Sequence, residues 1–437
     1  MIPTHPMPER LAGLFSTVLR ETAEQGEPEW RRARRESAFA RLRAEGFPTI
    51  RAEEWKYTNV RPLLDAAFAL PRCAAAAEIG GLLHNQLEDE CELIFVDGKF
   101  APEHSRFDEL PGLHVASLDD GLKNGLGERL RERLGAALPG DDSPFVCLNQ
   151  ALSGCGVYIG VDRNAVISKR IHVLFLTTGL QPGVMVSPRV VIDVATGGDV
   201  RVAQSHIGHP GNISFTNAVT DVHVADDARL FFAKVQLEAP EAFHCSYVRC
   251  RQGASSHVTL FDFSVGARLA RNDLYAGLDG EGAEVHLDGL YAVKDRQHVD
   301  HHTTVDHRVP QGMSRQIYKG ILNGAGRAVF NGKVIVRPGA KRTDGYQINQ
   351  NLLLSRTATV DTKPQLEIAN DDVKCTHGAT IGQIEDDQLF YLESRGIQKD
   401  AAVAMLSRGF VEDVLFLIRD QPLRDNLRGM LDAYFGK

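Results

Sequence analysis

Histidine and aspartate are concentrated in the segment from Gln297 to His307 (QHVDHHTTVDH), whose four imidazoles belong to His298, His301, His302 and His307. If the segment is a β-strand, alternate residues share a face. One face then carries Asp300, His302, Thr304 and Asp306, and the other carries His301, Thr303, Val305 and His307. Paired imidazoles on one face could bind zinc or iron. We favour the alternative, a ladder of hydrogen-bonded polar side chains between coils, because no second cluster of ligands is evident.

A second candidate site lies in the segment Asp371 to Gly378 (DDVKCTHG). In a strand, Cys375 and His377 project from the same face with Cα atoms roughly 6.5 Å apart. Both could then approach one iron atom, or the imidazole could help to deprotonate the thiol. Alternatively, Cys375 shares a buried face with Val373, as free cysteines often do. Spacing alone leaves both interpretations open.

The common signatures of nucleotide and hydrolytic chemistry are missing. The segment Gly326 to Val334 resembles a P-loop, but it has one residue too many between its glycines and no Ser or Thr after Lys333. We therefore do not expect this chain to hydrolyse ATP. It also lacks the G-x-S-x-G and H-E-x-x-H patterns. Cys245 and Cys250 resemble the start of a cluster motif whose third cysteine is absent, so we expect both in the core.

Composition narrows the class of protein. The chain has 437 residues and a formal net charge of -8, with 43% hydrophobic and 24% charged residues. The whole molecule therefore lacks the basic footprint expected of a nucleic-acid or anionic-lipid partner. No run approaches the roughly 18 apolar residues of a membrane helix, and the seven cysteines have no disulfide-framework spacing. These features predict a cytoplasmic protein without membrane or nucleic-acid partners.

The pattern of elements divides the chain into three parts. Residues 1–85 read as a mostly helical domain, residues 86–381 as a β core with a mixed α/β lead-in, and residues 382–437 as a helical domain. Within the core, turn signals recur every 25 to 30 residues, for example at Gly197–Asp199, Asp226–Ala228 and Gly253–Ser255. This spacing favours a β-solenoid over a β-sandwich because it continues for roughly 200 residues.

Several long blocks occur in an order that resembles the SufD family of iron-sulfur (Fe–S) cluster assembly scaffold subunits. The blocks are Arg51–Leu63, Asp300–His307, Thr362–Ile368, Asp371–Thr380, Asp387–Leu392 and Ser394–Ile397. The sister SufB family typically lacks the lysine-cysteine pair found here at Lys374 and Cys375. It carries a histidine-glutamate pair where this chain has His377 and Gly378, so the resemblance is to SufD.

The resemblance implies a right-handed parallel β-helix flanked by N- and C-terminal helical domains. It also implies a non-enzymatic subunit that pairs with SufB through the β-helix and with the ATPase SufC through the C-terminal helices. His377 matches the family histidine that helps to hold a nascent cluster at the SufB interface, and Cys375 is its neighbouring thiol. Two ligands do not complete a cluster, so the transient cluster would be shared with SufB and the isolated chain would hold no stable cofactor.

Two other functions were weighed against the scaffold. A β-helix carbohydrate-active enzyme could use acidic pairs such as Asp371 with Asp372, or Asp300 with Asp306, on a glycan. Only 7% of residues are aromatic, and a sugar cleft would more often show aromatics along one sheet. A homodimeric interaction protein is the other option, because an exposed β-helix edge readily pairs with its own copy. We expect such a homodimer when the chain is isolated.

Overall fold

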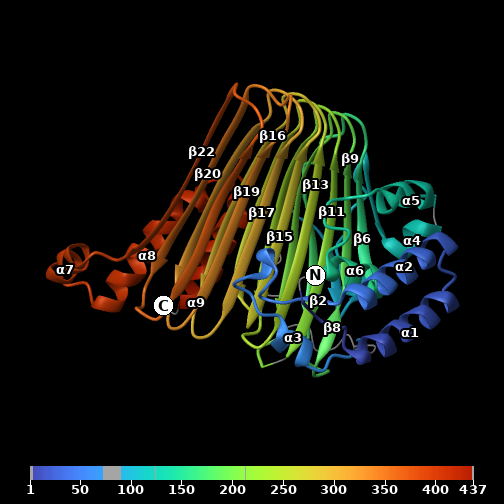
Figure 1. Cartoon of the computed structure of the whole chain (residues 1–437), viewed down its shortest axis with the longest axis horizontal. Coiled ribbons are helices and arrows are strands. Elements are labelled where there is room, and N and C mark those ends of the chain that lie inside the picture. The colour runs from blue at the N-terminus through green and yellow to red at the C-terminus, as the bar shows by residue number, and fades with distance from the viewer. Residues whose placement is uncertain (1–2, 72–89, 124, 212, 436–437) are drawn as a thin grey trace.

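In a computed structural model, the chain is built around two long sheets that face each other (Figure 1). The structure describes residues 3–71, 90–123, 125–211 and 213–435. The first sheet has the strand order β21-β19-β17-β15-β13-β11-β9-β6-β5, with β8 beside β11. The second has the order β22-β20-β18-β16-β14-β12-β10-β7-β3-β4. From β9 onward the chain alternates between the sheets, so each pair of strands forms one coil of a parallel β-solenoid, as predicted.

The strands that precede the regular coils are short. They are β1 (Thr4–His5), β2 (Phe47–Pro48), β3 (Glu90–Val96), β4 (Lys99–Phe100), β5 (Leu113–Ser117), β6 (Cys155–Val161), β7 (Arg170–Thr177) and β8 (Val184–Val186). The coils comprise β9 (Pro188–Val194), β10 (Asp199–Gly208), β11 (Ser214–Val224), β12 (Arg229–Glu238), β13 (Phe243–Gln252), β14 (His257–Gly266), β15 (Leu269–Leu278), β16 (Glu284–Val293), β17 (His298–His307), β18 (Met313–Leu322), β19 (Arg327–Val336), β20 (Thr343–Leu353), β21 (Thr359–Ile368) and β22 (Val373–Gln383). Predicted turns form the corners between them, where Asp227 (φ 58°) and Ser255 (φ 52°) adopt left-handed backbone.

The space between the sheets is divided lengthwise into an apolar and a polar strip. Valine, leucine and isoleucine fill one strip, which forms the largest hydrophobic cluster. Buried polar side chains fill the other, and they include Gln204, Lys234, Asp262, Asn272, His301, Thr303, Gln316 and Gln347. Lys234 is neutralised there by Asp262 at 2.9 Å. Ion pairing of this kind offsets the cost of burying a charge.

The N-terminal helices cover the outer face of the first sheet. They are α1 (Glu9–Glu24), α2 (Glu29–Glu45), the single-turn η1 (Glu53–Trp55) and α3 (Arg61–Asp65). The lead-in adds η3 (Pro102–His104), α4 (Leu118–Lys123), α5 (Gly127–Gly135) and α6 (Pro144–Leu152). The mixed lead-in predicted from the sequence thus contains short helices beside its strands. Sequence periodicity missed α6, because this helix is buried on nearly all sides and lacks a polar face.

Two of the three C-terminal helices that the structure describes, α8 (Lys399–Phe416) and α9 (Gln421–Phe435), cover the outer face of the second sheet. The third is α7 (Asp386–Ser394). Apolar residues of α8 and α9 pack on outward side chains of β12, β14, β16 and β18. Helix α7 has no buried residue and extends away from the solenoid (Figure 1). The proposed boundary between residues 85 and 86 lies outside the described residues. No described helix is long and apolar enough to span a membrane.

Candidate functional site at the open end of the solenoid

The last coil leaves one end of the solenoid uncovered. Among the strands of the described residues, β21 pairs only with β19, and β22 pairs only with β20. The outer edges of both strands therefore carry unpaired backbone groups, which is the usual template for adding another strand. Cys375 and His377 lie on β22, with Gly345 and Gln347 of β20 as their respective Cα partners. The structure thus places both predicted side chains on one face of the last strand, beside the open end.

Cys375 is half-buried and lies in a small apolar cluster with Val334, Leu366 and Val373. A Cβ at Gly345 would lie only 3.2 Å from the Cys375 sulfur, so the glycine leaves room for it. Burial raises the pKa of the Cys375 thiol, which is therefore protonated at neutral pH and would release a proton on binding iron. His377 is exposed. Cys375 thus packs beside Val373, and His377 follows two residues later on the same face of the strand.

The histidines of β17 face in two directions, as the alternation predicted. His301 points into the solenoid, where its ring stacks on Tyr291 with centroids 5.0 Å apart. His307 also points inward, with Nε2 2.9 Å from the Ser314 hydroxyl. Among the residues that the structure describes, no three His, Cys, Asp or Glu side chains are arranged to hold a metal ion. The segment therefore forms a polar ladder that contributes to the core.

The outward face of β17 anchors the N-terminal segment. The Thr58 hydroxyl donates to the Asp300 carboxylate and lies 2.8 Å from His298 Nε2. His302 bridges Asp300 at 3.1 Å and Glu54 at 3.3 Å. Two of the blocks that carried the family resemblance, Arg51–Leu63 and Asp300–His307, thus meet in one network. Sequence reasoning missed this contact because it joins residues more than two hundred positions apart.

The charges of this network shift the pKa values of its members. A hydrogen bond from His302 lowers the pKa of Glu54 to about 2, with Lys333 contributing. Burial and Arg271 lower the pKa of His302, but Asp300 and Glu54 outweigh them and the net pKa is raised. The pKa of Asp300 falls well below its usual range because Arg271 and His302 outweigh its burial. The Glu54 and Asp300 carboxylates are therefore ionised near neutral pH, and their contacts with His302 and Thr58 hold the N-terminal segment on the sheet.

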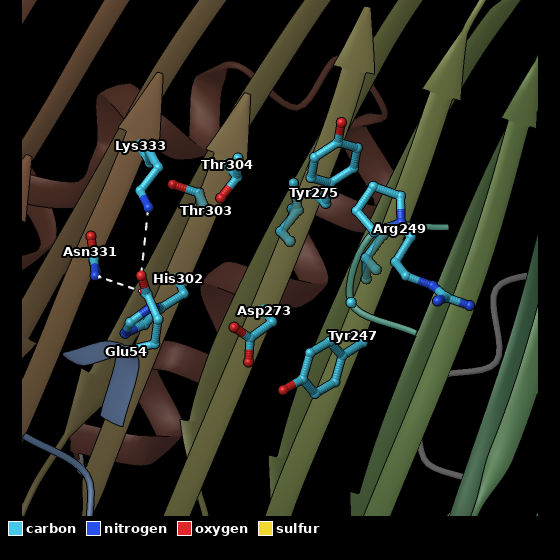
Figure 2. Close-up of a pocket in the computed structure, with 14 residues that line it drawn as sticks. Glu54, Tyr247, Arg249, Asp273, Tyr275, His302, Thr303, Thr304, Asn331 and Lys333 are labelled. Carbon is cyan, nitrogen blue, oxygen red and sulfur yellow. Dashed lines mark hydrogen bonds and ion pairs between the residues drawn. The ribbon is translucent and has the colours of Figure 1, made fainter. Parts of the chain in front are cut away.

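A cavity of about 160 Å³ opens beside this network on the outer face of the first sheet (Figure 2). Two cross-strand rows line it, Tyr247–Asp273–His302–Asn331 and Arg249–Tyr275–Thr304–Lys333. Glu54 reaches over the row ends, 3.5 Å from the Lys333 ammonium. Most of the charged groups that line the cavity are already paired, for example Arg249 with Asp221 at 2.5 Å. Locating these rows required the coil register, which local sequence patterns do not provide.

The C-terminal helices present a second cavity and exposed apolar side chains. A groove of about 740 Å³ lies between α8, α9 and the end of β18, and it is lined by residues such as Ile321, Leu354 and Met405. On α7, Phe390 is 72% exposed and Tyr391 is 57% exposed. Such a grouping of exposed apolar side chains marks a surface for protein contacts.

Residues 175–410 match the family described as "SUF system FeS cluster assembly, SufBD core domain", and residues 8–173 match the "SufBD protein N-terminal region". The chain belongs to the SufBD family. The iron-sulfur cluster assembly protein SufD of Escherichia coli is 32% identical over 388 residues, covering 87% of this chain and 88% of its relative. A SufBD family protein of Synechocystis is 32% identical over 407 residues, covering 90% and 89%. The predicted family resemblance is therefore confirmed.

The surroundings of Asp300 and Asp306 do not suit the acid/base chemistry of a carbohydrate-active enzyme. Two of the acidic residues that such an enzyme would need are buried and neutralised. Asp300 is bound by Arg271 at 2.7 Å, and Asp306 is bound by Arg337 at 2.8 Å and by Arg308 at 2.9 Å. Both carboxylates therefore serve the fold. The P-loop-like segment is likewise structural, because most of it lies within β19.

Proposed function

We propose that this chain is a non-enzymatic scaffold subunit of SUF Fe–S cluster assembly, which holds a nascent cluster at the open end of its solenoid. The observation that carries this proposal is the placement of Cys375 and His377 on the inner face of the edge strand β22, which is paired on one side, with β20. Thiolate and imidazole are both suitable iron ligands. Membership in the SUF assembly family indicates that the cargo bound by these ligands is an Fe–S cluster.

The partner that completes the site is SufB. A cluster that contains two iron atoms needs about four protein ligands, and this end of the solenoid offers two. The missing ligands would come from SufB and from sulfide, so the cluster is transient and shared. The free edges of β21 and β22 support pairing between the two solenoids, because parallel edge strands add main-chain hydrogen bonds to a partner. In the absence of SufB, the same edge would join two copies of this chain.

The ATPase partner is SufC, bound through the domain formed by residues 382–437. The exposed aromatic residues Phe390 and Tyr391 on α7 support this assignment. ATP hydrolysis would then occur in SufC. Its conformational effect would be transmitted to the solenoid through α8 and α9, which pack on the second sheet. Residues 1–85 would act as the N-terminal clamp on the first sheet, and residues 86–381 as the scaffold itself. The free thiols of the described cysteines suit the reducing cytoplasm.

Anaerobic co-expression with SufB and SufC tests the proposal. The purified heteromer is expected to contain iron and sulfide, and His377→Ala is expected to lose both without loss of the heteromer. His209→Ala, which removes another exposed histidine far from the last coil, is the matched control and should keep them. Wild-type iron and sulfide in His377→Ala would overturn the assignment of the site.

A further inference from the structure

Gln347 lies in β20, one coil inside the candidate site. Its side chain is fully buried and faces the interior of the solenoid. In the parallel register its Cα partner on β22 is His377, so the two residues occupy neighbouring rungs about 4.8 Å apart. Gln347 is therefore the inward-facing polar residue next to the imidazole along the strand ladder.

The orientation of the Gln347 amide is fixed from the other side. Its nitrogen donates to the Gln316 side-chain oxygen at 2.7 Å, and the Gln316 nitrogen donates to the Thr303 hydroxyl. Gln316 lies on β18, on the side of β20 away from β22. The Gln347 amide oxygen is buried and has no hydrogen-bond donor among the described residues. A buried acceptor without a donor is destabilising, so its retention needs a reason.

The opposite sheet leaves a slot for this amide. Gly332 of β19 faces it across the interior, and a Cβ at that position would overlap the Gln347 nitrogen. A glycine in the middle of a strand is unfavourable and usually marks a close approach. Gly332 is thus unfavourable for the strand itself but leaves the space that the Gln347 amide occupies in this orientation.

We propose that Gln347 is the positioning residue for His377, and that its amide oxygen accepts a hydrogen bond from the ring N–H of His377 in the assembled complex. A metal-bound histidine ordinarily donates its other N–H to an acceptor, and this bond fixes the tautomer and the ring orientation. His377 is exposed in the isolated chain. Covering of the open end by a partner would bring the ring onto Gln347 and leave its other nitrogen directed at iron.

Other groups at this end fit the role less well. Asn349 is occupied, because its side chain bonds the Tyr291 hydroxyl at 3.1 Å and the Asn351 amide at 2.7 Å. Thr362 has a buried hydroxyl oxygen without a partner, but a hydroxyl can donate as well as accept and so does not select a tautomer. The amide oxygen of Gln347 can only accept. The inference rests on the proposed role of His377 and adds the residue that orients it.

Gln347→Met tests the inference, because it keeps the volume and removes the acceptor. In the anaerobic heteromer, we expect iron content at limiting iron to fall about tenfold, with unchanged heteromer mass. Gln236→Met is the matched control, since Gln236 is a fully buried glutamine of β12 whose amide oxygen also has no partner and which lies several coils from His377, and iron content should stay within twofold of wild type. Nitrogen NMR of histidine-labelled heteromer should show one His377 tautomer in wild type and a mixture in Gln347→Met.

The outcomes separate the two proposals. If His377→Ala keeps iron and sulfide, the proposed function fails. If His377→Ala loses them while Gln347→Met keeps iron within twofold and retains a single tautomer, the positioning role is overturned. Equal losses in Gln347→Met and Gln236→Met would also overturn it, as a structural effect. Should Gln347→Met fail to form the heteromer, Gln347→Glu keeps an acceptor oxygen and must hold iron within twofold of wild type; a loss equal to that of His377→Ala would contradict the inference.

Discussion

Replacement of Arg271 by methionine is expected to release the N-terminal segment from the solenoid. The buried Arg271 guanidinium binds Asp300 at 2.7 Å and both oxygens of Asp273 at 2.8 and 2.9 Å. It also donates to the Glu54 carbonyl at 2.8 Å and lies 4.2 Å from the centre of the Trp55 ring. The side chain therefore joins two strands of the first sheet to the segment that carries η1.

The magnitude follows from what the substitution leaves behind. Removing one partner of a buried ion pair costs about 3–5 kcal/mol, because the other charge stays buried. Asp300 would keep its hydrogen bond from Thr58 and its contact with His302, which favours the lower part of that range. Loss of the cation–π contact with Trp55 adds about 1 kcal/mol. We therefore expect the free energy of unfolding to fall by about 3–5 kcal/mol.

Urea denaturation followed by Trp55 fluorescence in a Trp30→Phe background measures this loss at the affected segment. Arg327→Met is the control, because Arg327 is half-exposed and lies 3.4 Å from Asp361, and it should cost less than about 0.5 kcal/mol. The double variant Arg271→Met/Asp300→Asn should recover part of the loss, since it removes the stranded charge. A loss below about 1 kcal/mol in Arg271→Met, or an equal loss in Arg327→Met, would refute the reasoning.

Three further predictions concern other parts of the chain. Asp288 on the outer face of β16 is buried, one of its oxygens has no partner, and burial raises its pKa to about 7. Because ionisation of this carboxyl above pH 7 opposes folding, Asp288→Asn should stabilise the protein by up to about 4 kcal/mol at pH 8 and by little at pH 4. Thermal unfolding at the two pH values measures the difference. Glu54 has a lowered pKa and His302 a raised one, so the stabilisation from this ion pair is lost as pH falls toward 2 and as pH rises through the folded pKa of His302. The stability difference between wild type and Glu54→Gln should therefore be largest near pH 5 to 6 and smaller at pH 3 and pH 8. A difference that does not vary with pH would contradict the pairing. Deleting the chain from Asp386 onward should abolish co-purification with SufC while SufB still binds, and unchanged SufC in a pull-down would contradict the C-terminal assignment.

The solenoid and the faces of its strands could be predicted from the sequence because both depend on local periodicity. The period of two placed His301 and His307 on one face and Asp300 and His302 on the other, and the structure confirms this division, with the first pair facing inward. The same rule placed Cys375 and His377 on one face. Helix α6 could not be predicted this way, since burial on all sides removes the amphipathic signal.

The environment of the site could not be read from local patterns. Gln347 becomes the neighbour of His377 only through the coil register, and Gly332 meets the same amide from the opposite sheet. The contact between Thr58 and Asp300 likewise depends on where the N-terminal segment docks. In each case the sequence separation is set by intervening turns and helices, so the pairing follows from the assembled fold rather than from any one segment.

The single-sided pairing of β21 and β22 also determines how the molecule opens. In a stack of coils, stability is approximately a sum of terms between neighbours, and an end coil has only one neighbour. Amide hydrogen exchange should therefore be fastest in β21 and β22 and slow progressively toward β11. By this reasoning Cys375 and His377 should lie in the coil with the lowest free energy of unfolding. Binding of a partner to that coil would raise this free energy by mass action, so capture and release of cargo would be coupled to the fraying of one end of the stack.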